Sequence, residues 1–515
     1  MSRDDRYFLG SDIGTTLTKT VLVSSRGDEI AASSAEYEVL HPHPLWAEQW
    51  PQVWFDAFIE TVQDVLAKAP GRPEDIASIG ISGLYGGSGI PVDKQMKPIR
   101  PCIIWMDRRA EKEVDWIREN IDVEKLFTIT GNGVDTYHGF TKILWIKRNE
   151  PDNWKRIFKF LTPHGYLIHR LTSQLVIDQS SAGNIGGVFD LRHRAWSEAS
   201  CKRLGIPLEM LPERIVESSD VVGDVTVEGA RLTGLAVGTP VVAGGIDAAV
   251  ATLSAGAFDE GDQVAMIGTS MCWGVVHEGA SVSPQLVSMP YVAYPREKVY
   301  TFGGAATAGA LLRWFRDELW PCRMTQTQQR DVSPYKLLDD EAAALPPGSD
   351  RLIILPYFMG ERSPIWDSRA RGTVLGLTLS HTNAHIYRAL LEGVAYALRH
   401  NMEAGKQIGL QLGKTCILVG GAANSLLWTQ ILSDVTGYRF IAVGGSEAAL
   451  GDALLAGVGV GAIDRFEAVR SWLHPGSPVS PRVEAAKIYD ELFKIYCDLY
   501  AQLRTSMIRL SALAM

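Results

Sequence analysis

The sequence predicts an α/β protein with two large domains, and three observations support this. The chain has 515 residues, whereas a single hydrophobic core stops growing at roughly 250–300 residues. Short apolar runs alternate with amphipathic helical patterns over most of the chain, which is typical of α/β layers. A hairpin pattern near the N-terminus, with an apolar strand, a Gly-Thr turn and a second apolar strand, returns near the middle. We interpret it as a weak internal repeat.

The first hairpin opens the chain. Residues 7–11 and 19–23 are its predicted strands. Backbone N–H groups in such a turn, together with two hydroxyls, suit a phosphate oxygen. The carboxylate of Asp12 cannot favour phosphate, but it can hold Mg²⁺ or its waters against one. A Gly-Thr turn alone is more often only a turn. The turn contains Asp12, Gly14, Thr15 and Thr16.

The second hairpin lies far downstream. Residues 263–267 and 272–276 are its predicted strands, and its turn reads Gly268-Thr269-Ser270. This repetition strengthens the interpretation of both turns as phosphate-binding. One copy opens each half, so we predict domains at residues 1–255 and 256–515. No Gly-x-x-x-x-Gly-Lys-Ser/Thr motif occurs and no Gly-x-Gly-x-x-Gly opens a βαβ unit, so P-loop and dinucleotide sites are not supported.

Helical periodicity accounts for much of the remaining sequence. The tail from residue 483 to 513 has an apolar stripe at helical spacing, which predicts a helix packed on the second domain. The stripe consists of Tyr489, Leu492, Phe493, Tyr496, Leu499 and Leu503. Other predicted helices cover residues 54–67, 110–121, 141–148 and 385–402.

Composition excludes several classes of function. Hydrophobic content of 46% and charged content of 21% are those of an ordinary soluble globular protein. A net charge of -9 argues against nucleic-acid binding, which needs a clustered basic face. No apolar stretch reaches the roughly 20 residues of a membrane span, and no signal peptide is apparent. The six cysteines form neither CxxC nor zinc spacings, so we expect free thiols in a reducing cytoplasm.

Two glycine-rich turns follow apolar strands. The strand at 240–243 ends in Gly-Gly-Ile-Asp247. Asp247 either caps a helix that starts at Ala248 or accepts a proton from a substrate hydroxyl, and spacing alone does not separate these alternatives. The strand at 417–419 runs into Gly420-Gly421-Ala422 and then a helix from about Leu427, a unit common in α/β domains.

The stretch from Gly360 to Asp367 reads Gly-Glu-Arg-Ser-Pro-Ile-Trp-Asp, and an Arg-Ala-x-x-Glu-Gly helix follows at 388–393. These motifs resemble the C-terminal signature of the FGGY family of carbohydrate kinases. Blocks in the first half follow the order of the same family, so the resemblance covers nearly the whole chain. They are Pro44-x-Trp46-x-Glu48-Gln49, Trp105-x-Asp107-x-Arg109, Thr130-Gly131, Thr141-Lys142, Leu144-Trp145, Tyr166-Leu167, Leu171-Thr172, Asp178 and Ser180-Ser181.

The resemblance implies a two-domain actin-like (ribonuclease H-like) ATPase fold with its active site in an interdomain cleft. It implies transfer of the γ-phosphoryl group of ATP to a small sugar, with Asp247 as the catalytic base. Mg²⁺ would be held by Asp12 and Asp247, and domain closure would exclude water. The implied phosphate-binding residues are Gly14, Thr15, Thr16, Gly268, Thr269 and Ser270. The implied nucleotide-binding residues are Gly303, Gly304, Gly420, Gly421, Ala422 and Asn424.

For the sugar, the resemblance implies a pocket of aromatic and charged side chains, which suits a hydroxyl-rich ligand. Core packing or a surface ion pair could equally explain these side chains. Gly86 stands where xylulokinases carry a histidine, and the Arg-Glu pair of glycerol kinases is missing. We predict a pentulose such as xylulose, with glycerol, erythritol, gluconate or another polyol as alternatives. The implied substrate-binding residues are Leu84, Tyr85, Trp105, Asp107, Arg108, Tyr137 and Asp247.

Two other classes of protein remain as competing hypotheses. An actin-like ATPase acting as a chaperone or filament protein would keep both hairpins but would not need the stretch at 360–367. A silent sugar-binding regulator would be expected to lose Asp12 or Asp247, and both are present. Members of the family are often dimers or tetramers, so a homodimer is compatible with the resemblance, although no interface motif is visible.

Overall fold

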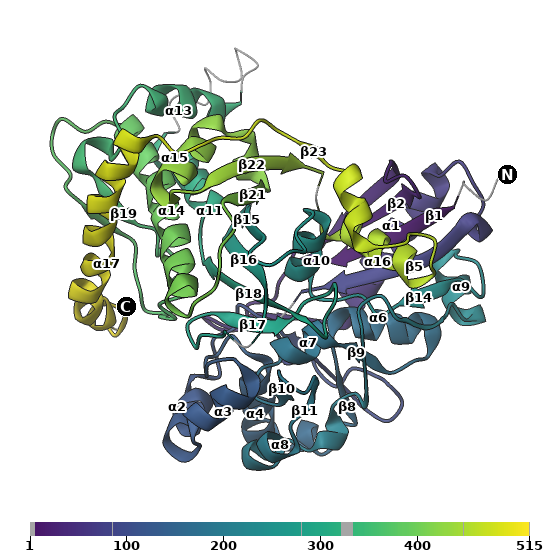
Figure 1. Ribbon diagram of the computed structural model, residues 1–515. Helices are drawn as coiled ribbons and strands as arrows, with labels where there is room; N and C mark the ends of the chain where they lie inside the picture. Colours follow the sequence, from purple (N-terminus) through teal and green to yellow (C-terminus); the bar gives the residue numbers. More distant parts are fainter. Residues whose placement is uncertain (1–5, 85, 280, 321–332, 446, 514–515) are drawn as a thin grey trace. The chain divides into compact units, whose positions relative to one another are not determined.

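The computed structural model describes residues 6–84, 86–279, 281–320, 333–445 and 447–513. They fold into two compact units (Figure 1). The first unit comprises Met1–Asp259, Val276–Thr301 and Gly445–Leu473, and the second comprises Glu260–Val275, Phe302–Gly444 and His474–Met515. The predicted domain boundary between residues 255 and 256 stays a prediction. None of the helices in the described part of the chain is long and apolar enough to cross a membrane.

The first unit is built on a six-stranded sheet in the order β13-β14-β5-β1-β2-β3. Its first strand pairs antiparallel with β2 and parallel with β5, so the predicted hairpin is confirmed, with longer strands than expected. Because β1 and β5 are parallel, their carboxyl ends lie at the same edge, where Asp12 is opposite Ser82. The strands are β1 (Tyr7–Ile13), β2 (Leu17–Ser24), β3 (Glu29–Glu36), β5 (Ile76–Gly83), β13 (Val221–Asp224) and β14 (Pro240–Val242).

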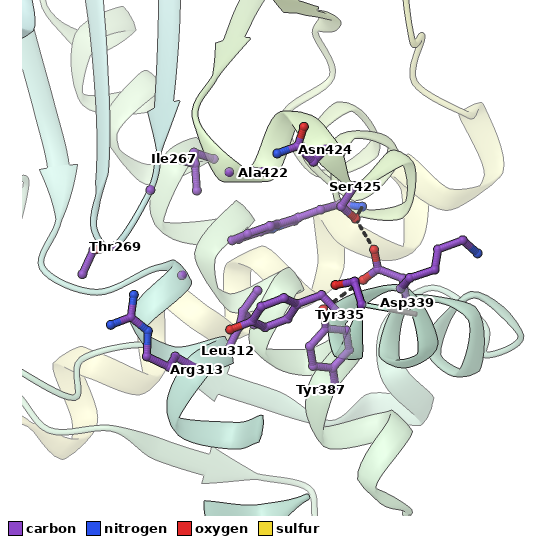
Figure 2. A pocket seen from close by; sticks show the side chains of 16 residues that line it. Ile267, Thr269, Leu312, Arg313, Tyr335, Asp339, Tyr387, Ala422, Asn424 and Ser425 are labelled. Atoms are coloured by element: carbon purple, nitrogen blue, oxygen red, sulfur yellow. Dashed lines mark hydrogen bonds between the residues drawn. The ribbon is translucent and has the colours of Figure 1, made fainter. Parts of the chain in front are cut away.

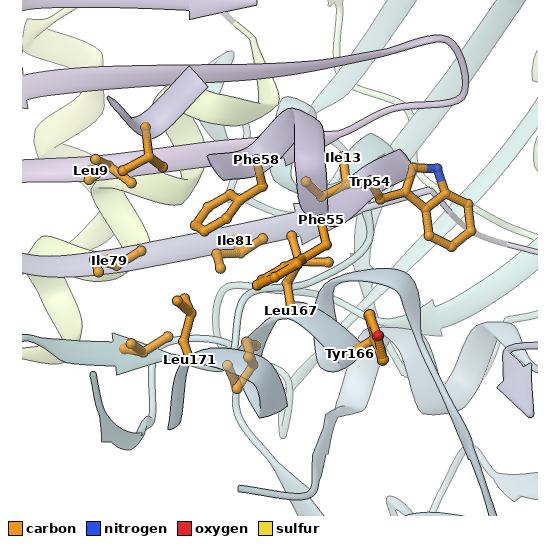
Figure 3. Packing of buried hydrophobic residues seen from close by; sticks show 14 of the residues in the cluster. Leu9, Ile13, Trp54, Phe55, Phe58, Ile79, Ile81, Tyr166, Leu167 and Leu171 are labelled. Carbon is orange, nitrogen blue, oxygen red and sulfur yellow. The ribbon is translucent and has the colours of Figure 1, made fainter. Parts of the chain in front are cut away.

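Helices α1 (Pro51–Lys68) and α6 (Pro163–Thr172) pack on this sheet through a fully buried core. Figure 3 shows Phe55 and Phe58 of α1 beside Ile79 and Ile81 of β5, with Leu167 of α6 next to them. Proline at the first helical position suits both helices, because its missing N–H has no partner there anyway.

Helix α16 (Ala448–Gly459) packs against β1 and β5. A Cβ at Gly10 would lie 1.9 Å from the carbonyl oxygen of Ala449, and one at Gly80 would lie 2.2 Å from that of Asp452. Only glycine therefore allows this helix to approach so closely. Since side chains alternate along a strand, Asp12 points to the same face of β1 as Gly10, which is the face that α16 covers.

The other helices of the first unit surround this core. Predicted helices at 110–121 and 141–148 are confirmed within a few residues as α2 and α4. The helices are α2 (Glu111–Asn120), α3 (Val123–Thr130), α4 (Gly139–Asn149), α5 (Pro151–Trp154), α7 (Gln179–Asn184), α8 (Glu198–Leu204), α9 (Val227–Thr233) and α10 (Asp247–Ser254).

The second unit repeats the local plan of the first hairpin. Strand β15 (Gln263–Ile267) pairs antiparallel with β16 (Met271–Glu278) and parallel with β21 (Thr415–Val419), and β22 (Arg439–Gly444) follows β21. The second predicted hairpin is therefore confirmed, and its turn is closed by a hydrogen bond from the N–H of Gly268 to the carbonyl of Ser270, 3.0 Å.

Long helices support this sheet. The predicted C-terminal stripe is confirmed, because Tyr489, Leu492, Tyr496 and Leu499 are buried. Figure 1 shows α14 and α17 as long helices within this unit. The helices are α11 (Gly309–Trp314), α13 (Pro334–Ala343), α14 (Asn383–Gln407), α15 (Leu426–Thr436) and α17 (Val483–Ser511).

Candidate active site

Asp12, Ser82 and Asp452 form an acidic cluster where β1 and β5 end and α16 covers the sheet. The hydroxyl of Ser82 donates to Asp452 Oδ2 at 2.6 Å and lies 3.3 Å from Asp12 Oδ1. Burial raises the pKa of Asp12 to about 6, against the hydrogen bond from Ser82, which lowers it. Lys19 forms an ion pair with Glu447 beside this cluster.

The negative charge of Asp247 also acts on this acidic cluster. Burial raises the pKa of Asp452 well above its usual value, and the negative charges of Asp12 and Asp247 add to this rise. Asp247 is the first residue of α10, and Ile246 occupies the capping position before it. Its Oδ1 accepts a hydrogen bond from the N–H of Ala248 at 2.6 Å. The side chain is only partly buried, so a ligand can reach it.

The first predicted phosphate turn is held in place by side chains from elsewhere in the first unit. Trp105 Nε1–H donates to Thr15 Oγ1 at 3.0 Å, and Gln49 donates to the Thr15 carbonyl at 2.8 Å. The hydroxyl of Tyr37 donates to the Gly14 carbonyl at 2.7 Å. Thr16 is exposed, whereas the N–H of Gly14 donates to the carbonyl of Leu17 at 3.0 Å and closes the turn.

Two of the sequence blocks meet around Arg109. Its guanidinium lies over the ring of Trp46, 3.7 Å from the centroid, and donates to Glu48 Oε1 at 2.6 Å. It also holds Asp107 Oδ2 at 2.7 Å, and the N–H of Ala47 donates to that same carboxylate at 2.6 Å. Asp107 has no exposed surface, and both of its carboxylate oxygens accept hydrogen bonds within this loop.

Two of the other predicted sugar-binding residues, Trp105 and Tyr137, lie close to Gly86. A Cβ at Gly86 would lie 2.9 Å from Trp105 Cβ and 3.0 Å from the ring of Tyr137. Arg108 donates to Asp135 Oδ1 at 3.1 Å, so it also has the predicted ion pair, and it remains partly exposed. Leu84 is buried, and Tyr85 lies outside the described residues.

Lys142, from the Thr141-Lys142 block, has a structural role that was not predicted from the sequence. Its fully buried ammonium donates to the carbonyls of Gly86 and Tyr137, both at 2.8 Å, and to that of Thr136. In the sequence, this role was indicated only by a lysine among the mostly apolar buried residues of α4. Lys142 joins two segments of the predicted sugar pocket.

The second unit contains a pocket of about 460 Å³ that runs away from the second hairpin turn. Figure 2 shows Thr269 at one end and Asp339 with Ser425 at the other. Of the predicted residues, Gly268, Thr269, Gly421, Ala422 and Asn424 line this pocket.

The far end of the pocket is shaped by residues that the sequence did not reveal. Asp339 accepts hydrogen bonds from Ser425 at 2.7 Å and from Tyr387 at 2.9 Å. Tyr335 and Trp428 add aromatic surface. The pocket combines aromatic side chains and a few polar groups at this end with glycines at the other, which is typical of small-molecule sites. These residues lie on α13, α14 and α15, and no motif joins them.

Gly303 and Gly304 lie in β18 (Lys298–Ala305) and do not belong to the lining of this pocket. The stretch at 360–367 supports them. The N–H of Gly304 donates to Ser363 Oγ at 2.6 Å, and the N–H of Ala306 donates to Glu361 Oε1 at 2.9 Å. Two side chains of the sequence signature, Glu361 and Ser363, therefore hold the end of this strand.

The buried carboxyl of Glu361 makes the free energy of unfolding depend on pH. Its Oε1 accepts from the N–H groups of Ala306 and Arg362, and within the described residues its buried Oε2 has no hydrogen-bond partner. Burial raises the pKa of this carboxyl from 4.5 to about 7. The folded state therefore binds the proton more tightly than the unfolded chain, so this carboxyl costs stability as the pH rises from about 4.5 to about 7.

Glu361→Gln should remove this pH dependence. Between pH 5 and pH 8 the free energy of unfolding of the variant should rise relative to wild type by on the order of 2–3 kcal/mol. Urea unfolding of both proteins at the two pH values measures the difference. Parallel pH profiles for the two proteins would show that Glu361 is not the titrating group.

The chain is similar to known proteins over nearly its whole length. The model of the N-terminal domain of the FGGY family of carbohydrate kinases matches residues 7–254, and that of its C-terminal domain matches residues 264–460. A xylulose kinase of Staphylococcus xylosus is 29% identical over 500 residues, covering 96% of this chain and 99% of its own. A gluconokinase of Bacillus subtilis (strain 168) is 30% identical over 502 residues, covering 96% and 95%.

The crystal structure of xylulose kinase from Rhodospirillum rubrum has the same fold. Its TM-score is 0.87 at 30% identity, with 98% of this chain and 100% of that chain covered. This likeness confirms the predicted two-domain α/β fold of the actin-like (ribonuclease H-like) class.

Proposed function

Because the chain belongs to the FGGY family of carbohydrate kinases, which are phosphotransferases with an alcohol group as acceptor, we propose that its substrate is a pentulose such as xylulose. The similarity to proteins named xylulose kinase supports this choice. Gluconate is the second candidate, because a protein named gluconokinase is equally similar.

The observation that carries the nucleotide part of the proposal is the pocket of the second unit. Gly268 and Thr269 would bind the phosphates of ATP at one end, while Ala422, Asn424 and Trp428 would contain the base and ribose at the other. Ser270 would assist at the hairpin turn. Gly303, Gly304, Gly420 and Gly421 would shape the backbone around the nucleotide.

In the first unit, we assign the chemical step to Asp247. The substrate hydroxyl oxygen forms a bond to the γ-phosphorus while the bond between that phosphorus and the leaving oxygen of ADP breaks. The proton of the hydroxyl passes to the Asp247 carboxylate. Gly14, Thr15 and Thr16 would bind phosphate oxygens.

The sugar would lie against Leu84, Trp105, Arg108 and Tyr137. Within this proposal Asp107 supports the Trp105 loop, since both of its oxygens already accept hydrogen bonds. A hydroxyl-rich ligand suits the partly exposed aromatic and cationic side chains that remain.

Asp12 and Asp247 have the chemistry to hold Mg²⁺. Mg²⁺ is commonly held by one or two carboxylates together with substrate phosphates and waters. The two side chains fit this donor set, since both charges act on Asp452. No group of three or more His, Cys, Asp or Glu side chains in the described part of the chain could hold a metal ion. When bound, the ion would neutralise charge on the phosphate oxygens.

We also propose the domains 1–255 and 256–515 and a cytoplasmic location. The family matches end at residue 254 and begin again at 264, which supports this division. Cys102, Cys201, Cys416 and Cys497 are free thiols, which is compatible with a reducing compartment.

Gly268→Val should weaken ATP binding without disturbing the fold. A Cβ at Gly268 meets no atom within 4 Å, so the added side chain would extend into the pocket at its phosphate end. We expect the KM for ATP to rise by roughly tenfold or more, the factor that a loss of 1.4 kcal/mol in binding gives. Steady-state kinetics at saturating sugar measures the change.

Gly444→Val is the matched control. It lies in the same unit, its Cβ also meets nothing within 4 Å, and it does not line the pocket. If both variants kept the wild-type KM for ATP, the pocket would not be the nucleotide site.

A further inference from the structure

A buried chain of hydrogen bonds ends at the Gly245–Ile246 peptide group, one residue before Asp247. The carbonyl of Gly245 accepts from the N–H of Gly83 at 3.0 Å. The N–H of Ile246, which belongs to the same peptide group, donates to Ser180 Oγ at 3.1 Å. This peptide is therefore held at both of its polar atoms, which fixes the backbone at Ile246, the residue directly before Asp247.

The hydroxyl of Ser180 is itself oriented. It donates to Asp178 Oδ1, which leaves its lone pairs to accept from Ile246. Asp178 Oδ1 also accepts from the N–H of Ser181 at 2.9 Å. His164 Nε2 lies 3.0 Å from Asp178 Oδ2. Because an ionised carboxylate only accepts, this ring nitrogen carries the proton.

The chain of residues is closed to solvent. His164, Asp178 and Ser180 are each 1% exposed, and Ile246 is 2% exposed. Burial opposes the ionised form of Asp178, but hydrogen bonds from His164 and Ser180 lower the pKa of its carboxyl below the usual value. A buried carboxylate that keeps its charge needs such donors.

Capping of a helix explains only part of this arrangement. Asp178 is the N-cap of α7 and accepts from Ser181. A cap needs neither His164 nor the bond from Ser180 to Ile246. Packing around the peptide is also tight, because a Cβ at Gly245 would lie 3.1 Å from Ser180 Oγ and one at Gly244 would lie 1.7 Å from the carbonyl oxygen of Ile81.

We propose that His164, Asp178 and Ser180 are positioning residues, which hold the Gly245–Ile246 peptide so that Asp247 faces the substrate hydroxyl. The inference rests on the proposed role of Asp247 as the base. A misplaced base loses catalytic rate steeply, and an error of 1 Å can cost about 10²-fold. The residues that would bind sugar and nucleotide are not part of this chain of hydrogen bonds, so substrate affinity should change little.

The test is a double-mutant cycle between Ser180 and Asp247. Ser180→Ala should lower kcat by about 10- to 100-fold, with KM for the sugar and for ATP within about twofold of wild type. In the Asp247→Ala background, the same change should leave the residual kcat unaltered, since Ser180 acts only through that carboxylate. Circular dichroism and thermal unfolding confirm that each variant is folded.

Asp190→Asn is the matched control. Like Asp178, Asp190 accepts hydrogen bonds from backbone N–H groups and lies beside a histidine ring. Its donors are the N–H groups of Arg192 and His193, and the His193 ring is 2.8 Å away. Within the described residues, none of these bonds reaches the strand before Asp247. It should keep wild-type kcat. Asp178→Asn, which retains one acceptor oxygen for Ser180, should show a smaller loss than Ser180→Ala.

The outcomes separate the two proposals. If Ser180→Ala keeps wild-type kcat, or lowers kcat equally in both backgrounds, the positioning role is wrong while Asp247 can still be the base. If Asp247→Ala itself turns over at the wild-type rate, the proposed function of Asp247 is wrong and the positioning role is overturned with it.

Discussion

Replacement of Asp247 with alanine should lower kcat by about 10²- to 10⁴-fold, the range that general-base catalysis contributes. The fold should survive, because the side chain is partly exposed and the hydrogen bond described for it goes to the adjacent N–H of Ala248. The KM values should change less than kcat, since a base acts mainly in the transition state. Steady-state kinetics of the purified, folded variant measures both parameters.

Glu228→Ala is a suitable control for this prediction. Glu228 is the acidic residue in the first turn of α9 in the same unit, so its removal changes net charge and the start of a helix in the same way. Its variant should keep wild-type kcat. Near-wild-type turnover by a folded Asp247→Ala protein would remove Asp247 from the mechanism.

Replacement of Arg388 with methionine should destabilise the second unit by about 3–5 kcal/mol, because a buried carboxylate would lose its cationic partner. Arg388 and Glu392 are 2% and 1% exposed, and their charged groups are 2.9 Å apart on α14. Glu392 also accepts from the N–H of Gly348 and from the hydroxyls of Ser349 and Tyr489. The pair therefore joins α14 to α17 and to the loop at 348–351.

Urea or thermal unfolding, followed by circular dichroism, measures this loss. Arg231→Met, which breaks the fully exposed pair of Arg231 with Glu228, should change stability little, because exposed ion pairs contribute little. Equal effects of the two substitutions would show that burial of the Arg388–Glu392 pair does not govern its contribution.

Local sequence patterns were sufficient to predict the two hairpins and the long helices. Alternating apolar runs and Gly-Thr turns depend on neighbours in the chain, so β1, β2, β15 and β16 could be located from residues that are close in sequence. The helical stripe of α17 was visible for the same reason. Asp247 could be placed after its strand, but sequence spacing alone could not separate a base from a cap.

The parts of the site that the sequence did not predict depend on contacts between segments that are far apart in the chain. Asp107 was predicted to bind substrate, yet Arg109 and the N–H of Ala47 occupy its carboxylate, and no local pattern reveals this. The far end of the pocket in the second unit joins Asp339 of α13, Tyr387 of α14 and Ser425, the N-cap of α15. Asp452 meets Asp12 through Ser82 only because β1, β5 and α16 come together.

The measurement that tests the central claim most directly is release of ADP from Mg²⁺-ATP in the presence of single sugars. The panel should contain D-xylulose, D- and L-ribulose, gluconate, glycerol and erythritol. We expect D-xylulose to give a kcat/KM well above the others, with little ADP in the absence of sugar. A dominant response to gluconate would retain the kinase and change its substrate. ADP release that no sugar stimulates would contradict the account and favour an actin-like ATPase that phosphorylates no sugar.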